Sequence, residues 1–305
     1  MNAQSGSRSG DLPFTWDLLG AFLAVMRTGS LSGAARALGV AQPTVRRQIS
    51  ALEATLGAAL FTRSHAGLRA TEAAQATLPY AESMAGVAAA LVRSVSAPSS
   101  SEAGTVRVTC SEILAVEVLP RILADLRRAH PQLQIELSAT NQNEDLLRRD
   151  ADVAIRMAPP TQGALVAKRV GNIEVGLFAT HEYLRAHPAP KSAPSLRQHA
   201  LVGRDRDPSF LTALASAGLR LRRQDFALRT DSDTAALAAV RAGLGIGVCQ
   251  VRLAARDRAL TRILPKVRFV MPTFVVTHED LRRTRRIAVV FEHLARALGA
   301  YAKAD

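Results

Sequence analysis

Residues 30–63 read SLSGAARALGVAQPTVRRQISALEATLGAALFTR, and this stretch contains two helical patterns separated by a tight turn. In the first pattern, Leu31, Ala34 and Leu38 recur at spacings of three and four residues, which places them on one face of a helix. Gly39 follows directly, as a left-handed C-cap residue would. The first half of the stretch therefore predicts a short helix that ends at this glycine.

The second pattern repeats the apolar face with Val45, Ile49 and Leu52, and Gly57 marks its end. Two short helices joined by three or four residues that include a glycine form a helix-turn-helix. The second helix of such a unit can enter the major groove of DNA. The stretch thus indicates a DNA-binding module.

Polar side chains cover the other face of the second helix: Gln42, Thr44, Arg46, Arg47, Gln48 and Ser50. Glutamine can bond adenine through two atoms, and arginine can do the same to guanine. Any amphipathic helix has a solvated polar face, so polarity alone does not decide. The first three of these side chains lie in the first turns, the part of a recognition helix that reaches base edges, and this position favours DNA.

Residues 58–71 follow with two short apolar pieces around Ser-His-Ala-Gly, which predicts a small hairpin. After a helix-turn-helix, such a hairpin is a wing. Arg63 and Arg69 would then lie near phosphates or the minor groove. The alternative is an exposed hairpin with solvated arginines.

Four motifs in this region, SLSxAAxxL, QPTV, QIxxLE and LGxxLFxR, resemble the N-terminal domain of LysR-type transcriptional regulators. The resemblance covers nearly the whole chain. It implies an α-helical winged helix-turn-helix domain over residues 15–71, in which DNA is contacted by Ser30, Ser32, Gln42, Pro43, Thr44, Arg46, Arg47, Arg63 and Arg69. Helix capping explains Ser30 equally well.

Two positions depart from the family pattern. The family usually has Ser or Thr where this chain has Ala41, so the side-chain N-cap of the recognition helix is missing. It usually has Ser where this chain has Arg46. This arginine predicts a contact to guanine or phosphate that a serine would not make.

The length of 305 residues suggests two or three domains, and a hydrophobic content of 48% is ample for burial. No stretch of eighteen apolar residues is present, which excludes a membrane-spanning helix. Residues 1–14 are polar and rich in Ser and Gly, so we expect a disordered leader and not a signal peptide. Cys110 and Cys249 provide no disulfide framework, and a reduced, cytoplasmic protein fits.

The formal net charge of +13 suggests nucleic acid as a partner, but its distribution weakens this argument. Residues 1–98 hold 8 basic and 5 acidic side chains, and the remainder holds 31 and 21. The DNA-binding half is therefore not the main source of charge. A genome whose base composition favours Arg and Ala codons is an alternative explanation. Charge supports nonspecific attraction to phosphates and does not identify the site.

Around this module we expect a first helix over Trp16–Arg27, capped by Thr15, and a long helix over residues 72–93. Small apolar residues form a stripe on the long helix: Ala74, Leu78, Ala81, Ala85, Ala88 and Val92. The stripe permits close pairing with a second copy, as the family resemblance implies, although a plain core helix would look similar. Pro79 should bend the helix or cost a hydrogen bond. The Ser-rich residues 94–104 are expected to form a hinge.

From residue 105 the chain alternates strands and helices, which indicates an α/β domain. We expect helices over Ile113–Ala129, Glu144–Arg149, Ser209–Ala217, Thr234–Ala242 and Leu281–Ala300, with strands over Thr105–Thr109, Leu133–Leu137, Val153–Ile155, Ala200–Val202, Ala227–Thr230, Gly245–Cys249 and Phe274–Thr277, and a strand pair within Leu165–Phe178. Two such series fit two subdomains, as in periplasmic solute-binding proteins.

The family resemblance extends into this effector-binding domain, residues 105–303, through residues 143–156 and 242–249. Subdomain I is expected over about 105–178 and 279–303, and subdomain II over about 179–278. A ligand would lie between them, at the carboxyl ends of strands.

Eight residues at those strand ends are predicted to bind the ligand: Ser111, Glu112, Thr140, Asn141, Arg156, Arg204, Thr230 and Asp231, with Ser232 next to the last of them. A hydroxyl and N–H groups at a helix start can hold an anion, and arginine can pair with a carboxylate. We therefore expect a small organic acid or a similar metabolite. Capping and surface ion pairs explain many of these residues as well.

Other motifs are given structural interpretations. Gly243-Leu-Gly-Ile-Gly247 lies after a helix and before a strand, the reverse of a dinucleotide loop, so we assign it to capping and close packing. In His278-Glu279-Asp280, Asp280 is expected to cap the terminal helix, and metal binding is disfavoured. Cys110 is expected to be structural or to line the pocket.

The sequence thus predicts a cytoplasmic LysR-like transcriptional regulator that binds a pseudo-palindromic operator in double-stranded DNA. From the resemblance we expect a homo-oligomer, a dimer or a tetramer through effector-domain contacts, and RNA polymerase as a partner. No catalytic, cofactor or metal site is predicted. The alternative function is a small-molecule-binding protein whose N-terminal domain serves only oligomerisation. An enzyme is a more distant alternative, because no base–nucleophile pair is recognisable.

Overall fold

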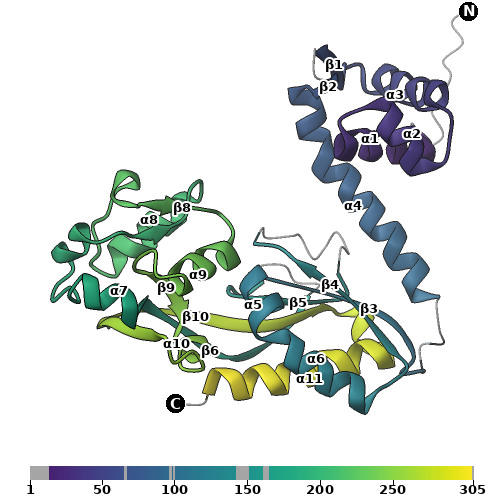
Figure 1. Cartoon of the computed structure of the whole chain (residues 1–305). Helices are drawn as coiled ribbons and strands as arrows, with labels where there is room; N and C mark the ends of the chain where they lie inside the picture. Colours follow the sequence, from purple (N-terminus) through teal and green to yellow (C-terminus); the bar gives the residue numbers. More distant parts are fainter. Residues whose placement is uncertain are drawn as a thin grey trace, which may run out of the picture. The chain divides into compact units, whose positions relative to one another are not determined.

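A computed structural model describes residues 14–64, 67–95, 98, 100–141, 151–160 and 165–303. The chain forms two compact units, residues 1–89 and residues 90–305, which are considered separately (Figure 1). The first unit is mainly helical, and the second is a mixed α/β unit. This division matches the predicted fold class, an α-helical DNA-binding domain followed by a larger α/β domain.

The N-terminal unit contains three short helices, α1 (Trp16–Thr28), α2 (Leu31–Leu38) and α3 (Gln42–Leu56), then a hairpin of β1 (Phe61–Ser64) and β2 (Gly67–Ala70), and the start of α4 (Glu72–Ser94). Phe22, Val25, Val45 and Leu52 are buried in one core. The helices and the wing hairpin were all predicted. Local patterns suffice here because each helix has its own apolar face and its own terminating glycine.

Left-handed glycines end the first three helices, as predicted for two of them. Gly39 and Gly57 each have φ of +67°, and both donate their N–H groups to carbonyls of the preceding helix. Ser30 caps α2, because its Oγ accepts from the N–H of Gly33 at 3.0 Å. Thr15 occupies the N-cap position of α1, but its side chain makes no capping bond there.

The expected pairing stripe on α4 is wrong in its first half. Ala74 and Ala81 are buried in the core of the N-terminal unit itself, and Leu78 packs against the same core. A different apolar row is exposed instead. Tyr80, Val87 and Leu91, spaced seven and four residues apart, are 67%, 42% and 67% exposed. This row has the spacing of a coiled-coil seam.

The C-terminal unit is built on a six-stranded sheet in the order β4-β3-β5-β10-β6-β9, with a separate parallel pair β7–β8. The strands are β3 (Gly104–Cys110), β4 (Leu133–Ala139), β5 (Val153–Arg156), β6 (Leu165–Thr180), β7 (Val202–Gly203), β8 (Leu228–Arg229), β9 (Gly247–Gln250) and β10 (Leu260–His278). The helices are α5 (Glu112–Glu117), α6 (Leu119–Ala129), α7 (His181–Ala186), α8 (Pro208–Ser216), α9 (Asp233–Arg241), α10 (Val251–Ala254) and α11 (Arg285–Lys303), with 3-10 turns η2 (Pro194–Gln198), η3 (Arg223–Asp225) and η4 (Asp280–Arg283).

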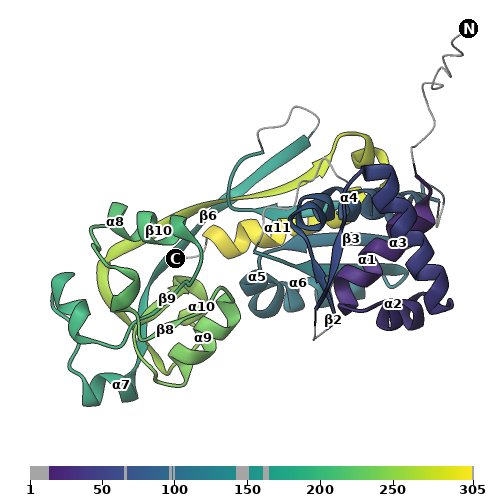
Figure 2. The same cartoon turned by 90° about the horizontal axis from the view of Figure 1, so that it is seen from above.

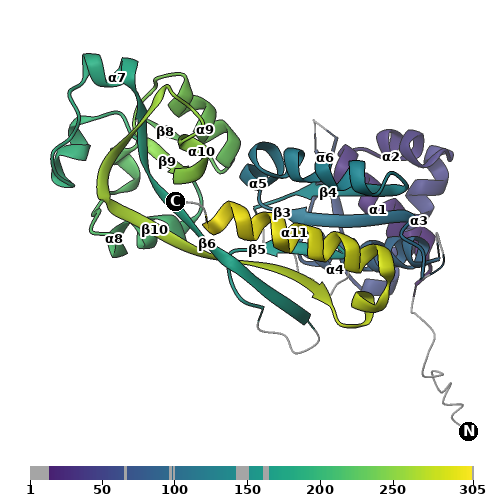
Figure 3. The ribbon, with the colours of Figure 1, turned by 90° about the horizontal axis from the view of Figure 1, so that it is seen from below.

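Two long strands, β6 and β10, connect the two halves of this unit. They pair antiparallel from Leu165↔His278 to Thr180↔Leu260, with two register shifts. Helices α5, α6 and α11 gather around one end of this ribbon and α7 to α10 around the other (Figures 2 and 3). Each end of the β6–β10 pair packs against a core of its own. The chain therefore crosses from one subdomain to the other within β6 and crosses back within β10.

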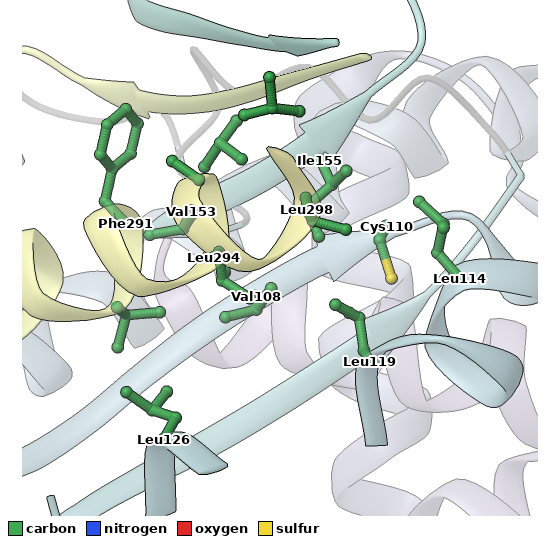
Figure 4. Packing of buried hydrophobic residues seen from close by; sticks show 14 of the residues in the cluster. Val108, Cys110, Leu114, Leu119, Leu126, Val153, Ile155, Phe291, Leu294 and Leu298 are labelled. Carbon is green, nitrogen blue, oxygen red and sulfur yellow. The ribbon is translucent and has the colours of Figure 1, made fainter. Parts of the chain in front are cut away.

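The core of the first subdomain lies between the sheet and its helices. Val108 and Val153 of the strands, Leu126 of α6 and Leu294 of α11 are fully or almost fully buried together (Figure 4). Burial of such side chains contributes about 1.5–3 kcal/mol each to stability. This packing holds the ends of β3 and β4, where the predicted ligand residues lie, in fixed positions.

Several expected elements differ in the structure. The single helix expected over Ile113–Ala129 is two helices, because Pro120 lies in the first turn of α6 and cannot continue the hydrogen-bond ladder of α5. The strand pair expected in Leu165–Phe178 is the single strand β6, and β10 begins fourteen residues before the expected Phe274. Asp280 does not cap the terminal helix: it begins η4, and α11 starts at Arg285. The helix expected over Glu144–Arg149 lies outside the described residues.

Candidate functional site

The N-terminal end of α3 and the wing carry the side chains predicted to contact DNA. Gln42, Pro43, Arg46 and Arg47 are exposed on α3, and Thr44 is partly exposed. The α3 N-terminus lacks a side-chain cap at Ala41, as the sequence predicts. Its first N–H groups therefore have no capping side chain, and they are of the kind that can bind a phosphate.

The other predicted DNA contacts lie before and after α3 in the sequence, at the start of α2 and on the wing. Arg63 on β1 and Arg69 on β2 are exposed, and each pairs in register with a residue of the opposite strand. Ser32 is exposed in the first turn of α2, whereas the Oγ of Ser30 is used as a cap. The hydroxyl of Ser30 can still donate its own proton to a phosphate.

Glu53 fixes the wing to the recognition helix. Its Oε1 accepts from the N–H groups of Leu60 and Phe61, at 2.7 and 3.2 Å. Thr71 closes the other end of the hairpin, since its N–H donates to the carbonyl of Leu60 at 2.9 Å and its Oγ1 accepts from Ala74 in α4. The recognition helix, wing and α4 are therefore joined by bonds to two polar side chains, Glu53 of the QIxxLE motif and Thr71 after the wing.

In the C-terminal unit, three of the predicted ligand residues meet where the two subdomains face each other. The Oδ1 of Asn141 accepts from the N–H of Glu112 at 3.1 Å, and its Nδ2 donates to the carbonyl of Asp231 at 3.4 Å. Ser232 donates from Oγ to the Glu112 carboxylate at 2.8 Å. Asn141 and Glu112 belong to one subdomain, and Asp231 and Ser232 to the other, so the Asn141–Asp231 and Ser232–Glu112 bonds connect the two subdomains.

The remaining predicted residues surround this contact. Ser111 precedes α5, and its buried Oγ has no hydrogen-bond partner among the described residues. The N–H of Thr140 donates to the carbonyl of Cys110, Arg156 donates to the carbonyl of Ile155, and Thr230 accepts from the N–H of Ser232. These groups lie at strand ends, as expected.

Arg204 is already paired within the protein. Its guanidinium contacts Asp233 at 2.5 Å and Asp207 at 3.5 Å. The pKa of Asp233 is raised, and burial is the largest cause. Arg204 acts in the opposite direction, whereas the nearby Glu112 carboxylate adds to the increase. Asp231 does not face the ligand region with a free carboxylate either, because its Oδ1 accepts from the N–H groups of Asp205 and Arg206.

Sequence reasoning missed Asp233 and Thr234. Asp233 pairs with Arg204, and the Oγ1 of Thr234 lies 2.9 Å from the Oγ of Ser232. The run Asp231-Ser-Asp-Thr234 before an apolar helical pattern is a capping signal, and Ser232 indeed caps α9 through the N–H of Ala235. The same signal places polar groups at a helix start that borders the contact between the two subdomains.

The family models match both units of the chain. Residues 16–75 match the helix-turn-helix domain of bacterial regulatory proteins of the lysR family, and residues 99–299 match the LysR substrate binding domain. The chain belongs to the LysR family of DNA-binding transcriptional regulators.

Individual relatives agree with this family. The LysR-type chain is 33% identical over 162 residues to the Mau operon transcriptional activator of Paracoccus denitrificans, an alignment that covers 53% of this chain and 57% of that protein. It is 30% identical over 234 residues to ClcR of Pseudomonas putida, covering 74% and 79%. The fold resembles full-length CbnR in complex with its target DNA, with a TM-score of 0.63 and 23% identity over 93% of this chain and 100% of that one.

The junction between α4 and the effector-binding domain of the LysR-type chain contains buried charges. Arg93, in the last turn of α4, pairs with Asp152 at 3.2 Å, and both side chains are more than nine-tenths buried. Asp152 also accepts from the N–H of Arg107 at 2.8 Å, and buried Arg286 of α11 donates to the carbonyl of Arg93 at 2.8 Å. The last turn of α4 is thereby fixed to β3, β5 and α11.

The expected hinge is also attached near its far end. Glu102 bonds Arg285 at 2.8 Å and His130 at 2.7 Å, and these two partners lower the pKa of Glu102, with Arg285 the larger cause. Arg93 just before this segment and Glu102 near its end are thus both bonded to residues of the LysR substrate binding domain.

The cysteines of this LysR-type chain are structural. Cys110 and Cys249 are both buried and free, and burial raises the pKa of each thiol to about 12. Cys110 belongs to the core of the first subdomain, where burial raises its pKa and the nearby Arg156 acts in the opposite direction. These thiols are packed groups and not thiolate nucleophiles.

The Gly-rich turn has the structural role predicted for it. Gly243 has φ of +78° after α9, and a Cβ at Gly245 would lie 2.1 Å from the carbonyl oxygen of Ala200. His278 lies 3.5 Å from Asp280. Among the described residues, no group of three or more His, Cys, Asp or Glu side chains is arranged to hold a metal ion. None of the described helices is long and apolar enough to cross a membrane.

Proposed function

We propose that this LysR-family protein regulates transcription by placing α3 in the major groove of an operator, with the β1–β2 hairpin on the flanking backbone. The observation that carries the proposal is the exposed polar start of α3. Gln42 and Arg46 can read base edges, whereas Arg63 and Arg69 on the wing suit phosphate or the minor groove.

Arg46 tests the base-reading role. Arg46→Ala should weaken specific operator binding by about 1–3 kcal/mol and relax selection at one base-pair position, if the guanidinium bonds guanine. The matched control is Arg185→Ala on α7, an exposed arginine of the effector-binding unit that removes the same charge. The measurement is affinity against a panel of operator variants at fixed salt. A uniform loss across all variants would reassign Arg46 to phosphate.

The operator itself is found by footprinting the purified protein on DNA beside its own gene, at physiological salt with competitor DNA. Protection over several turns, with half-sites one turn or a multiple apart, supports the regulator. Salt-sensitive coating with no preferred site would support the alternative in which the N-terminal unit only oligomerises the protein.

A homo-oligomer is proposed from the exposed row Tyr80, Val87 and Leu91 on α4. Val87→Glu should shift the protein toward monomer in analytical ultracentrifugation, because a charge on an apolar seam is costly. Ala89→Glu is the matched control, since this exposed residue lies on a different face of the helix. Equal effects of both variants would contradict pairing through this row; a tetramer would require additional effector-domain contacts.

For the effector we propose a small organic acid in the cleft around Glu112, Asn141 and Ser232. Its carboxylate would replace Asp233 at Arg204, because Asp233 is the partner whose ionised form is disfavoured by burial. Small carboxylic acids should then raise the melting temperature of the protein, and amines of similar size should not. Asp233→Asn should preserve or tighten this response, and Arg204→Gln should remove it.

A protein that changes promoter geometry when an effector binds would act on RNA polymerase, and it would do so in the cytoplasm. Regulation, and not catalysis, is the activity we propose for the cleft.

A further inference from the structure

A hollow lies at the far ends of the two helices whose first residues border the proposed effector site. The cleft residues Glu112 and Asp233 begin α5 and α9, whereas Glu117 and Arg241 end the same helices. Around these last residues is a hollow of about 250 Å³, lined by Glu117, Arg121, Arg241, Leu253, Arg256, Asp257 and Arg258. We name it the arginine hollow.

One arginine of the hollow is fully neutralised. Arg241 pairs with both oxygens of Glu117, at 2.5 and 3.1 Å, and its Nε donates to Asp257 at 3.0 Å. Among the residues that the structure describes, these two acids are the only carboxylates that line the hollow. Both are therefore engaged with the same guanidinium.

The other three arginines retain their charge toward solvent. Arg121, Arg256 and Arg258 are exposed, and in the described part of the chain none has a carboxylate oxygen within 4.0 Å. Four arginines against two carboxylates leave an excess of two positive charges at the hollow. A concave surface of one sign concentrates counterions of the opposite sign.

Arg256 is held in place by an aromatic ring. Its guanidinium carbon lies 5.4 Å from the centre of the Tyr301 ring, and Arg252 contacts the same ring at 5.5 Å while donating to the carbonyls of Ala300 and Tyr301. A guanidinium that is already positioned loses less conformational freedom when it binds a ligand. This favours a binding role over a freely moving surface charge.

The hollow also joins both subdomains. Glu117 and Arg121 belong to α5 and α6 of the first subdomain, and Arg241 and Arg256 belong to the second. An anion held by Arg121 together with Arg256 or Arg258 would add a bond between the subdomains, on the far side of α5 and α9 from the cleft.

We infer that the arginine hollow is a second ligand site, for a small anion that carries two or more negative charges on clustered oxygens, of phosphate or polycarboxylate chemistry. Its occupation would set the subdomain angle independently of the cleft. The binding itself does not depend on the proposed function; only its effect on DNA does.

The test uses the full chain and four probes at equal ionic strength: pyrophosphate, citrate, inorganic phosphate and acetate. In the Arg204→Gln variant, which lacks the proposed carboxylate contact of the effector site, we expect saturable binding of pyrophosphate or citrate by calorimetry, at least tenfold tighter than phosphate, and none with acetate. Whichever of the two binds more tightly identifies phosphate or polycarboxylate as the preferred chemistry. Equal weak responses to all four would overturn the site.

Paired variants locate the binding. Arg256→Gln with Arg258→Gln should reduce pyrophosphate or citrate affinity at least tenfold. The control, Arg282→Gln with Arg283→Gln, removes two exposed charges from η4 and should change affinity less than twofold. Arg46→Ala should also leave it unchanged, which separates the hollow from the DNA-binding surface. An equal loss in both double variants would reduce the effect to net charge and contradict the inference.

The effect of the anion on DNA binding is measured separately, by footprinting with and without the anion. If the anion binds but leaves the footprint unchanged, the site stands and its coupling to DNA does not. If no operator is found, the calorimetric result is unaffected. The failure of the proposed function and the failure of the second site are thus distinguishable.

Discussion

At the scale of single residues, burial determines what the two cysteines can do. Cys110 is packed among Val108, Leu114 and other core side chains, and its thiol has a pKa of about 12 (Figure 4). At pH 8 a free cysteine with a pKa near 8.5 is about one-quarter ionised, and this thiol would hold roughly two-thousandfold less thiolate.

We therefore expect native Cys110 and Cys249 to react with iodoacetamide at least a hundredfold more slowly than in the urea-unfolded chain at pH 8. The rate should rise with pH, because the thiolate is the reacting form and its pKa lies above the tested range. Mass spectrometry of labelled peptides measures each thiol separately. Labelling of Cys110 at the unfolded rate would contradict its place in the core.

Contacts between residues close in the sequence could be predicted from it, whereas long-range ion pairs could not. Ser30, Ala41 and Gly39 could be interpreted locally, because a cap involves residues within four positions. The ion pair of Arg204 with Asp233 spans 29 positions, and that of Arg241 with Glu117 spans 124. No pattern in the sequence pairs such distant residues, so Arg204 was expected to be available to a ligand.

At the scale of elements, helices were predicted more accurately than the long strands. The helices carry one apolar stripe each. Strand β10 contains Pro265 and Pro272, which indicate strand ends, and it serves two different cores along its length. Pro265 falls in the register shift between Ile263 and Arg268, and so the strand continues past it.

Two glycines, one inside α1 and one in the turn before β9, should respond oppositely to substitution by alanine. Gly20→Ala should raise the stability of the N-terminal unit by about 0.5–1 kcal/mol, because Gly20 lies inside α1 and its added Cβ meets nothing within 4 Å. Gly245→Ala should lower the melting temperature of the C-terminal unit, since its Cβ would strike the Ala200 carbonyl.

Differential scanning calorimetry of both single variants resolves the two effects if the units unfold in separate transitions. Hydrogen exchange gives the same information unit by unit. A Gly245→Ala protein as stable as the parent would show that β9 and the preceding turn can move away from Ala200, which the close packing argues against.

At the scale of the whole molecule, the Arg93–Asp152 pair joins the end of α4 to the effector-binding domain. Removing one partner of a buried ion pair leaves an uncompensated charge and costs about 3–5 kcal/mol. Asp152→Asn should therefore destabilise the C-terminal unit by this amount in urea unfolding. Asp125→Asn, which breaks an exposed pair with Arg128 on α6, should cost less than about 1 kcal/mol.

A small effect of Asp152→Asn would mean that Arg286 and the carbonyl of Arg93 hold the junction without the carboxylate. The segment expected to be a hinge would then be less firmly attached than its contacts indicate. The double variant with Arg93→Gln distinguishes these cases, because its cost should be well below the sum of the single costs if the two side chains act on each other.

The continuous ribbon of β6 and β10 has a mechanical consequence. Two subdomains joined by flexible loops would have no preferred angle. A hydrogen-bonded pair of strands resists twisting and bending, so it favours one resting angle. Any subdomain angle other than the resting one would therefore store elastic energy, which the proposed effector would have to supply from its binding. The stiffness of the β6–β10 pair would then set the effector concentration at which the protein responds. Substitutions in these strands should change that concentration without altering the residues proposed to contact the effector or the anion.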